Sequence, residues 1–129
     1  MEPMNLKEDY CSYEISKLLK EKGFDGLCYT YYPRGVKDKY NISMLADNHN
    51  KHSETSRPTL QMAMKWLRDY PNYIFIGIEN QYLFSYEVYH YHIRCNAPKR
   101  EIDKISKVNY RTYEEAVEAT LKYSLENLI

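Results

Sequence analysis

Glycine and cysteine are scarce in this chain of 129 residues, and neither sign of charge is in excess. The four glycines are too widely scattered to build a phosphate-binding loop. The three cysteines also stand far apart, without a CxxC pair, at Cys11, Cys28 and Cys95. This spacing argues against a disulfide framework and against a tetrahedral zinc site, and it favours buried, reduced thiols.

Lysine plus arginine and aspartate plus glutamate both number 18, so the formal net charge is zero. The chain therefore has no overall positive field to attract nucleic acid or an anionic membrane. No apolar run approaches the roughly 20 residues of a membrane span, and residues 1–9 are too acidic for a signal peptide. We expect a single cytoplasmic domain over residues 1–129, without a membrane partner.

Tyrosine is abundant where other aromatic residues are few, with 15 tyrosines against three phenylalanines and one tryptophan. A phenol combines an apolar ring with a hydroxyl that both donates and accepts hydrogen bonds. Such a side chain suits a half-buried sheet face and a contact surface equally well. The composition therefore indicates a binding surface but identifies no reaction.

Two helices are predicted with clear ends. Ser12 is a good N-cap for a helix over residues 13–22, and Gly23 can adopt the left-handed conformation that ends it. Thr112 and Glu115 form a capping box for a terminal helix that runs almost to the end of the chain.

A further helix begins at Pro58 and Thr59 and stops at Pro71. Its apolar residues form two adjacent stripes, an arc wider than one contact surface needs. This pattern predicts a helix that is either central to the fold or partly exposed to another chain, with Trp66 in the second stripe.

The strongest strand prediction covers residues 73–79, where three isoleucines alternate with Tyr73, Phe75 and a glycine. Residues 80–81 are predicted to form the turn, and residues 82–94 to return as an antiparallel partner. Apolar residues change from even to odd positions along this partner, which predicts a β-bulge near Val88 and Tyr89.

The remaining segments give weaker patterns. Residues 27–32 predict a short strand that joins the same sheet. Residues 33–57 predict a long irregular connection, the first place to look for a partner, with a brief strand at residues 40–45. Residues 96–109 are compatible with a helical turn or with a final strand.

These elements predict an α+β fold, in which an antiparallel sheet around the long hairpin is packed by about three helices on its isoleucine face. The opposite, tyrosine-bearing face is then free to bind a protein partner or a second copy. We expect the protein to be a non-enzymatic binding module that needs no cofactor. The expected anchors are aromatic, because such residues dominate interface energetics: Trp66, Tyr73, Phe75, Tyr89 and Tyr91.

Single-stranded nucleic acid is an alternative partner. Basic groups beside aromatic rings can hold phosphates while the bases stack. The clearest basic cluster consists of Lys99, Arg100, Lys104, Lys107 and Arg111. Glu101 and Asp103 interrupt this cluster, and a segment of such mixed charge is more commonly a solvated edge of the fold.

A small metal-dependent hydrolase is the other alternative. His90 and His92 share one face of the predicted strand, and Cys95 follows. A closed metal site needs about four converging ligands, and two are visible. His49 and His52 complete a set of four only if their loop folds over the hairpin.

Three segments together resemble a known group of proteins: SYEISKLLKEKGFD at residues 12–25, PTLQMAMKWLR at residues 58–68 and YEEAVEATLKYSLENLI at residues 113–129. They are similar to a family of small proteins from gut anaerobes of the Bacteroides type and from their phages and mobile elements. The resemblance implies an accessory protein that acts by binding, and it brings no catalytic residues.

Overall fold

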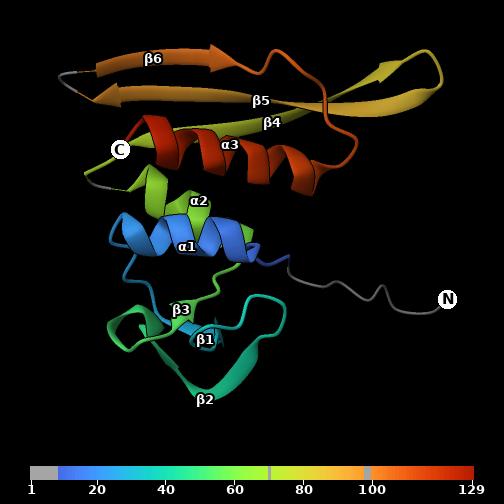
Figure 1. Ribbon diagram of the computed structural model, residues 1–129. Helices are drawn as coiled ribbons and strands as arrows, with labels where there is room; N and C mark the ends of the chain where they lie inside the picture. Colours follow the sequence, from blue (N-terminus) through green and yellow to red (C-terminus); the bar gives the residue numbers. More distant parts are fainter. Residues whose placement is uncertain (1–8, 70, 98–99) are drawn as a thin grey trace, which may run out of the picture.

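The computed structural model describes residues 9–69, 71–97 and 100–129, and in it the helices form a layer between two antiparallel sheets (Figure 1). The elements in chain order are α1 (Tyr13–Glu21), β1 (Cys28–Tyr32), β2 (Asn41–Asp47), the short 3-10 helix η1 (His49–Lys51), β3 (Thr55–Ser56), α2 (Leu60–Arg68), β4 (Ile74–Leu83), β5 (Tyr86–Ala97), β6 (Arg100–Ile105) and α3 (Tyr113–Asn127). The α+β fold class is confirmed. None of the described helices is both long enough and apolar enough to cross a membrane.

The helices begin where their capping residues predict. Ser12, Thr59 and Thr112 each accept a hydrogen bond from the backbone N–H three residues later, at 3.3, 3.1 and 3.1 Å. Each bond satisfies an N–H group that the first turn of a helix leaves without a partner. Thr59 is thus the N-cap of α2, and the helix itself begins one residue later than predicted.

The end of α1 forms a Schellman motif. Gly23 has a φ of +92°, and the N–H of Phe24 donates to the carbonyl oxygen of Leu19 at 2.9 Å. The chain reversal folds Phe24 back into the core, where its ring meets the edge of Trp66 at 5.7 Å between centroids.

The large sheet has the order β4-β5-β6. Strands β4 and β5 pair without interruption from Ile74 opposite Cys95 to Leu83 opposite Tyr86, so the turn is the two-residue loop Phe84–Ser85. The predicted turn at residues 80–81 and the predicted bulge are both wrong. In a hairpin with a two-residue loop, an even-numbered residue faces an odd-numbered one. Tyr89, Tyr91 and Ile93 therefore share the isoleucine face without a bulge, whereas Tyr86 and Val88 lie on the other face of the same strand.

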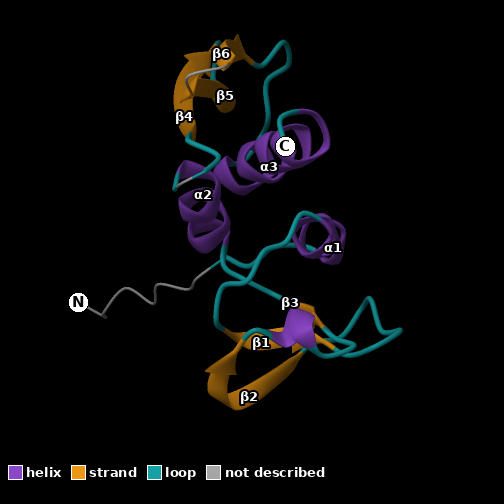
Figure 2. Cartoon of the chain, turned by 90° about the vertical axis from the view of Figure 1, so that its left-hand side faces the viewer, coloured by secondary structure: helices purple, strands orange, loops and turns teal. Residues whose placement is uncertain are grey.

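The small sheet has the order β2-β1-β3, and it lies on the other side of the helix layer (Figure 2). The prediction that residues 27–32 join the hairpin sheet is wrong, because β1 pairs with β2 on one side and with β3 on the other. The segment 33–57 is therefore not one irregular connection. It supplies β2, η1 and β3, with the brief strand at 40–45 extended to residues 41–47.

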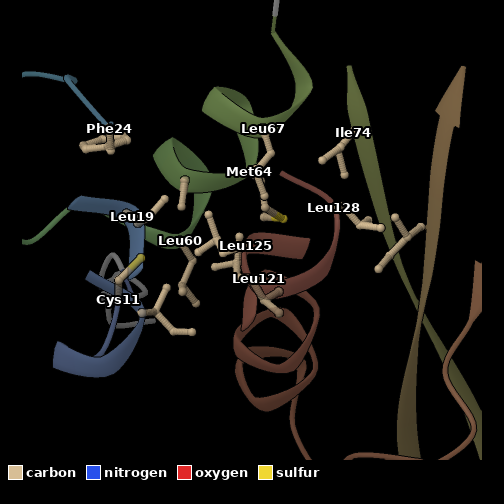
Figure 3. Close-up of a cluster of buried hydrophobic side chains, with 14 of the residues drawn as sticks. Cys11, Leu19, Phe24, Leu60, Met64, Leu67, Ile74, Leu121, Leu125 and Leu128 are labelled. Atoms are coloured by element: carbon tan, nitrogen blue, oxygen red, sulfur yellow. The ribbon is translucent and has the colours of Figure 1, made fainter. Parts of the chain in front are cut away.

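The hydrophobic core lies between the three helices and the isoleucine face of the large sheet (Figure 3). Helices α2 and α3 pack on β4, and α3 also packs on β5. Helix α1 packs instead on α3 and on β3, so only two of the three helices make the main cover of the large sheet. The largest fully buried side chains include Leu19, Leu67, Ile74, Ile93, Leu121 and Leu125.

Three buried hydroxyls from the facing helices α1 and α3 have no hydrogen-bond partner among the described residues: Ser16, Thr120 and Ser124. Burial of an unpaired hydroxyl opposes folding, so its isosteric removal should stabilise the protein. We expect Thr120→Val to raise the free energy of unfolding by about 1 kcal/mol.

The matched control is Thr112→Val, the same chemical change at a residue whose hydroxyl caps α3. It should lower the free energy of unfolding by about 1 kcal/mol. Urea denaturation of both variants checks the pair, and a loss of stability in Thr120→Val would show that its hydroxyl has a partner.

Candidate binding surface

The outer face of the large sheet carries the side chains that alternate with the isoleucines. Cross-strand neighbours lie on one face, and here Phe75 stands opposite Arg94 and Glu79 opposite His90. Since α2 and α3 pack on the isoleucine face, most of this outer face is uncovered, although Val88, opposite Gln81, is buried. Tyr73 and Phe75 are accordingly exposed, as the sequence predicts.

The two other predicted sheet anchors lie on the opposite face. Tyr91 stands opposite Ile78, and Tyr89 stands opposite Asn80, so both belong to the isoleucine face. Tyr91 is only 7% exposed, and burial raises the pKa of its phenol. Its ring stacks on Tyr110 with centroids 6.2 Å apart. The prediction that Tyr89 and Tyr91 share the outer face with Tyr73 and Phe75 is wrong.

Tyr89 takes part in contacts within this chain. Its backbone N–H and C=O both pair with Tyr110 at 2.7 Å, and its ring meets the edge of Tyr113. Its hydroxyl donates to the Glu87 carboxylate at 3.2 Å, and the charge of that carboxylate raises the pKa of the phenol. These contacts fasten the start of α3 to β5.

Trp66 is half-buried on α2, remote from the outer sheet face in the fold. It lines a mainly apolar pocket of about 200 Å³ together with Phe24, Gly26, Met62, Lys65 and Asp69. The structure therefore does not join Trp66 to Tyr73 and Phe75 in one surface, because the helix that carries it lies on the covered side of the sheet.

The hairpin tip forms an aromatic surface that sequence reasoning missed. The β4–β5 hairpin extends beyond α3, so both of its faces are open at the tip (Figure 1). Tyr82 and Tyr86 are exposed there, and the Phe84 side chain is 99% exposed.

Phe84 also has an unusual backbone conformation. Its φ of +60° lies in the left-handed region, which a side chain with a Cβ normally avoids. Phe84 is the first central residue of a two-residue hairpin loop, a position that favours glycine when φ is positive. Tyr73, just before β4, has a φ of +51°, so aromatic residues in this conformation stand at both ends of the strand.

The histidines of β5 form two separate pairs with carboxylates on the outer face. His90 Nε2 lies 3.2 Å from Glu79 Oε2, and His92 Nε2 contacts Asp103 Oδ1. Among the described residues no group of three or more histidines, cysteines and carboxylates is placed to hold a metal ion. The loop histidines do not complete the set, because His49 is buried in η1 beside the small sheet and His52 pairs with Asp47 at the end of β2.

Two described residues of the basic cluster, Lys104 and Arg111, lie in different places. Lys104 lies on the isoleucine face, where its Nζ stands 4.4 Å from the ring centroid of Tyr123. Arg111 lies near the hairpin tip, 5.8 Å from the Tyr86 ring centroid. Lys99 and the side chain of Arg100 lie outside the described residues.

Neither Cys11 nor Cys28 is an activated nucleophile. All three cysteines are reduced and buried, as the sequence predicts. Burial raises the pKa of Cys28 to about 11 and raises that of Cys11 even more. Both groups are therefore thiols at neutral pH, whereas nucleophilic catalysis requires a thiolate.

Comparisons of this chain with protein families, with curated proteins and with solved structures find no match. The resemblance to a family of gut anaerobes and their mobile elements therefore stays a prediction.

Proposed function

We propose that this protein is a non-enzymatic docking module whose hairpin tip inserts into an apolar pocket of another protein. The main anchor is Phe84, flanked by Tyr82 and Tyr86. Tyr73 and Phe75 extend the contact along the outer sheet face. Such an accessory role fits the expected origin in a mobile element, and reduced thiols fit a reducing cytoplasm.

The observation that carries the proposal is the conformation of Phe84. A left-handed backbone costs a residue with a Cβ about 1 kcal/mol or more, and this ring regains nothing by burial within its own chain. Glycine or asparagine would form the same turn at lower cost. A phenylalanine that opposes folding at a protruding tip is explained if the ring is buried in a partner.

The chemistry of the tip defines the partner. Residues 82–86, with the sequence YLFSY, carry no charge. The complementary site is therefore an apolar pocket of a size to hold one phenyl ring, with polar groups at its rim for the two tyrosine hydroxyls. Glu79 and Glu87 stand close behind the tip, which disfavours an anionic membrane surface as the target.

The first expected result separates stability from binding. Phe84→Asn retains a residue that tolerates positive φ but removes the ring. We expect it to raise the free energy of unfolding by about 1 kcal/mol, and Phe84→Gly to have a similar effect. Both changes are measured by urea denaturation, and a clear loss of stability in both would show that the ring packs within this chain.

The same variant tests docking. The wild-type protein is attached to a resin, exposed to lysate of the source organism and compared quantitatively with Phe84→Asn. The control is Val108→Asn, which removes an exposed apolar side chain elsewhere. A protein retained by wild type and by the control but lost with Phe84→Asn supports the proposal. If every retained protein binds Phe84→Asn equally well, the hairpin tip is not a docking site.

A further inference from the structure

Strand β2 forms an open edge of the small sheet. It is the outermost strand, and among the described residues only β1 pairs with it. Natural edge strands are usually protected by lysine, proline, inward-pointing charges or a β-bulge, and of these devices β2 has the bulge. The β2 sequence NISMLAD contains no lysine, arginine or proline, and its one charge is at the end, at Asp47.

A bulge exposes the apolar side chains of this strand. Thr30 pairs with Ile42, and Cys28 pairs with Asp47. The single β1 residue between these pairs therefore lies opposite four residues of β2, 43–46. Bulges redirect side chains away from the regular faces of a sheet. Met44 and Leu45 are 96% and 80% exposed.

The exposed apolar area is large enough for a stable interface. Ile42 is 73% exposed, and Leu27 and Tyr29 on the neighbouring β1 segment are also exposed. With Met44 and Leu45, these five side chains present on the order of 700 Å², close to the roughly 800 Å² that each partner buries in a standard interface. A surface of this kind rarely stays uncovered in a soluble protein.

We infer that a second copy of the chain covers this surface, by antiparallel pairing of β2 with β2 about a twofold axis at Met44. Paired residue numbers then sum to 88, so Met44 faces itself and Asp47 faces Asn41 of the second copy. Asp47, the only charged residue of the strand, therefore does not face Asp47 of the second copy. A net charge of zero also leaves no long-range repulsion between the two chains.

Pairing in this register has three consequences. Backbone groups of β2 that do not pair with β1 gain hydrogen bonds, apart from the Leu45 carbonyl oxygen, which already accepts from the Ser43 hydroxyl, and the two small sheets join into one of six strands. The apolar residues of each β2 meet those of the other copy in an isologous contact. The large sheet and the hairpin tip take no part, so this inference does not depend on the proposed docking function.

Sedimentation equilibrium from micromolar to several hundred micromolar protein tests the dimer. We expect wild type to dimerise and Met44→Lys to weaken the dimer by about tenfold or more, because two ammonium groups would face each other. Met44 is almost fully exposed, so the melting temperature of the Met44→Lys monomer should match that of the wild-type monomer. Val108→Lys, with the same change of charge at another exposed apolar residue, should dimerise as wild type does.

The register is tested by cysteine cross-linking. A cysteine at position 44 faces its own copy at a distance that permits a disulfide, whereas a cysteine at position 42 faces Ala46. Mild oxidation should therefore cross-link Met44→Cys but not Ile42→Cys, and the native thiols are buried and should not interfere. A wild-type protein that is monomeric throughout, or a Met44→Lys dimer of unchanged affinity, would overturn the inference. Phe84→Asn should leave dimerisation intact, which separates the two surfaces.

Discussion

Replacing Leu121 by alanine is expected to lower the free energy of unfolding by about 3 kcal/mol. Leu121 is fully buried on α3, within the cluster that also contains Leu60 and Leu67 of α2 and Ile74 of β4 (Figure 3). Truncation removes apolar surface from a close-packed interior and leaves a cavity that the surrounding helices can only partly fill. Urea denaturation monitored by circular dichroism gives the value directly.

The neighbouring residue on the same helix provides the control. Lys122 is exposed, and its Nζ lies 2.9 Å from a Glu14 carboxylate oxygen on α1. An exposed ion pair of this kind contributes little, so Lys122→Ala should lower the free energy of unfolding far less than Leu121→Ala does. A Leu121→Ala variant that lost less than this control would contradict the central position of α3.

The second large effect is expected in the small sheet, from Asn50→Ala. The Asn50 amide nitrogen donates to the carbonyl oxygen of Phe24 at 3.0 Å, and its oxygen accepts from the N–H of Ser56 at 2.8 Å. Removal of the amide leaves both backbone groups unpaired in a partly buried place. We expect a loss of about 2 kcal/mol, since each unsatisfied group costs roughly 1 kcal/mol or more.

This effect should be concentrated in the small sheet, because polar contacts hold that sheet in place and, of its described residues, the core cluster includes Cys28 alone. His49 Nε2 donates to the carbonyl oxygen of Cys28 at 2.9 Å, and His49 Nδ1 lies 3.2 Å from Glu54 Oε1. Lys20 of α1 donates to the carbonyl oxygen of Glu54 at 2.6 Å and so ties the helix to this segment.

Hydrogen exchange followed by mass spectrometry locates the effect. In Asn50→Ala, the peptides of β1, β2 and β3 should exchange faster than in wild type, while those of β4 and β5 change less. The control is Asn127→Ala, whose side chain makes one exposed bond to the carbonyl oxygen of Tyr123. Equal loss of protection in both sheets would show that they unfold as one unit.

The helices could be predicted because their signals are local. A cap such as Ser12 or Thr112 acts on a backbone group three residues away, and Gly23 acts on the turn just before it. The predicted bounds of α1 and α3 differ from the structure by only a residue or two. The strand at 74–83 was also identified in part, because alternation of isoleucines is a local pattern.

The hairpin shows where local reasoning failed. Asn80 and Gln81 have the composition of a turn, yet they stand within β4, opposite Tyr89 and Val88. Phe84 forms the turn against its own preference, because uninterrupted pairing along β4 and β5 determines where the chain reverses. A backbone propensity of about 1 kcal/mol does not outweigh the cross-strand bonds of a long hairpin.

The candidate site was predicted in part for the same reason. Tyr73 and Phe75 alternate with the isoleucines of their own strand, so their outward placement follows from the sequence. The faces of Tyr89 and Tyr91 depend on whether the return strand contains a bulge, because one extra residue moves every later side chain to the other face. The shift of the two-residue turn from 80–81 to 84–85 leaves the faces unchanged, so the wrongly predicted bulge is the cause of the error. The exposed edge of β2 depends on which strand pairs with which.

The sequence by itself determined the α+β class, the three helices with their caps, the reduced state of the cysteines and the outward side of β4. These features rest on interactions between residues a few positions apart, or on composition. Only the tertiary structure decided that β1 belongs to a separate sheet, that Phe84 stands at a protruding tip and that β2 forms an open edge. Those features depend on backbone pairing between distant segments. Nearly every residue offers the same backbone N–H and C=O groups, so the side chains do not show which segments pair.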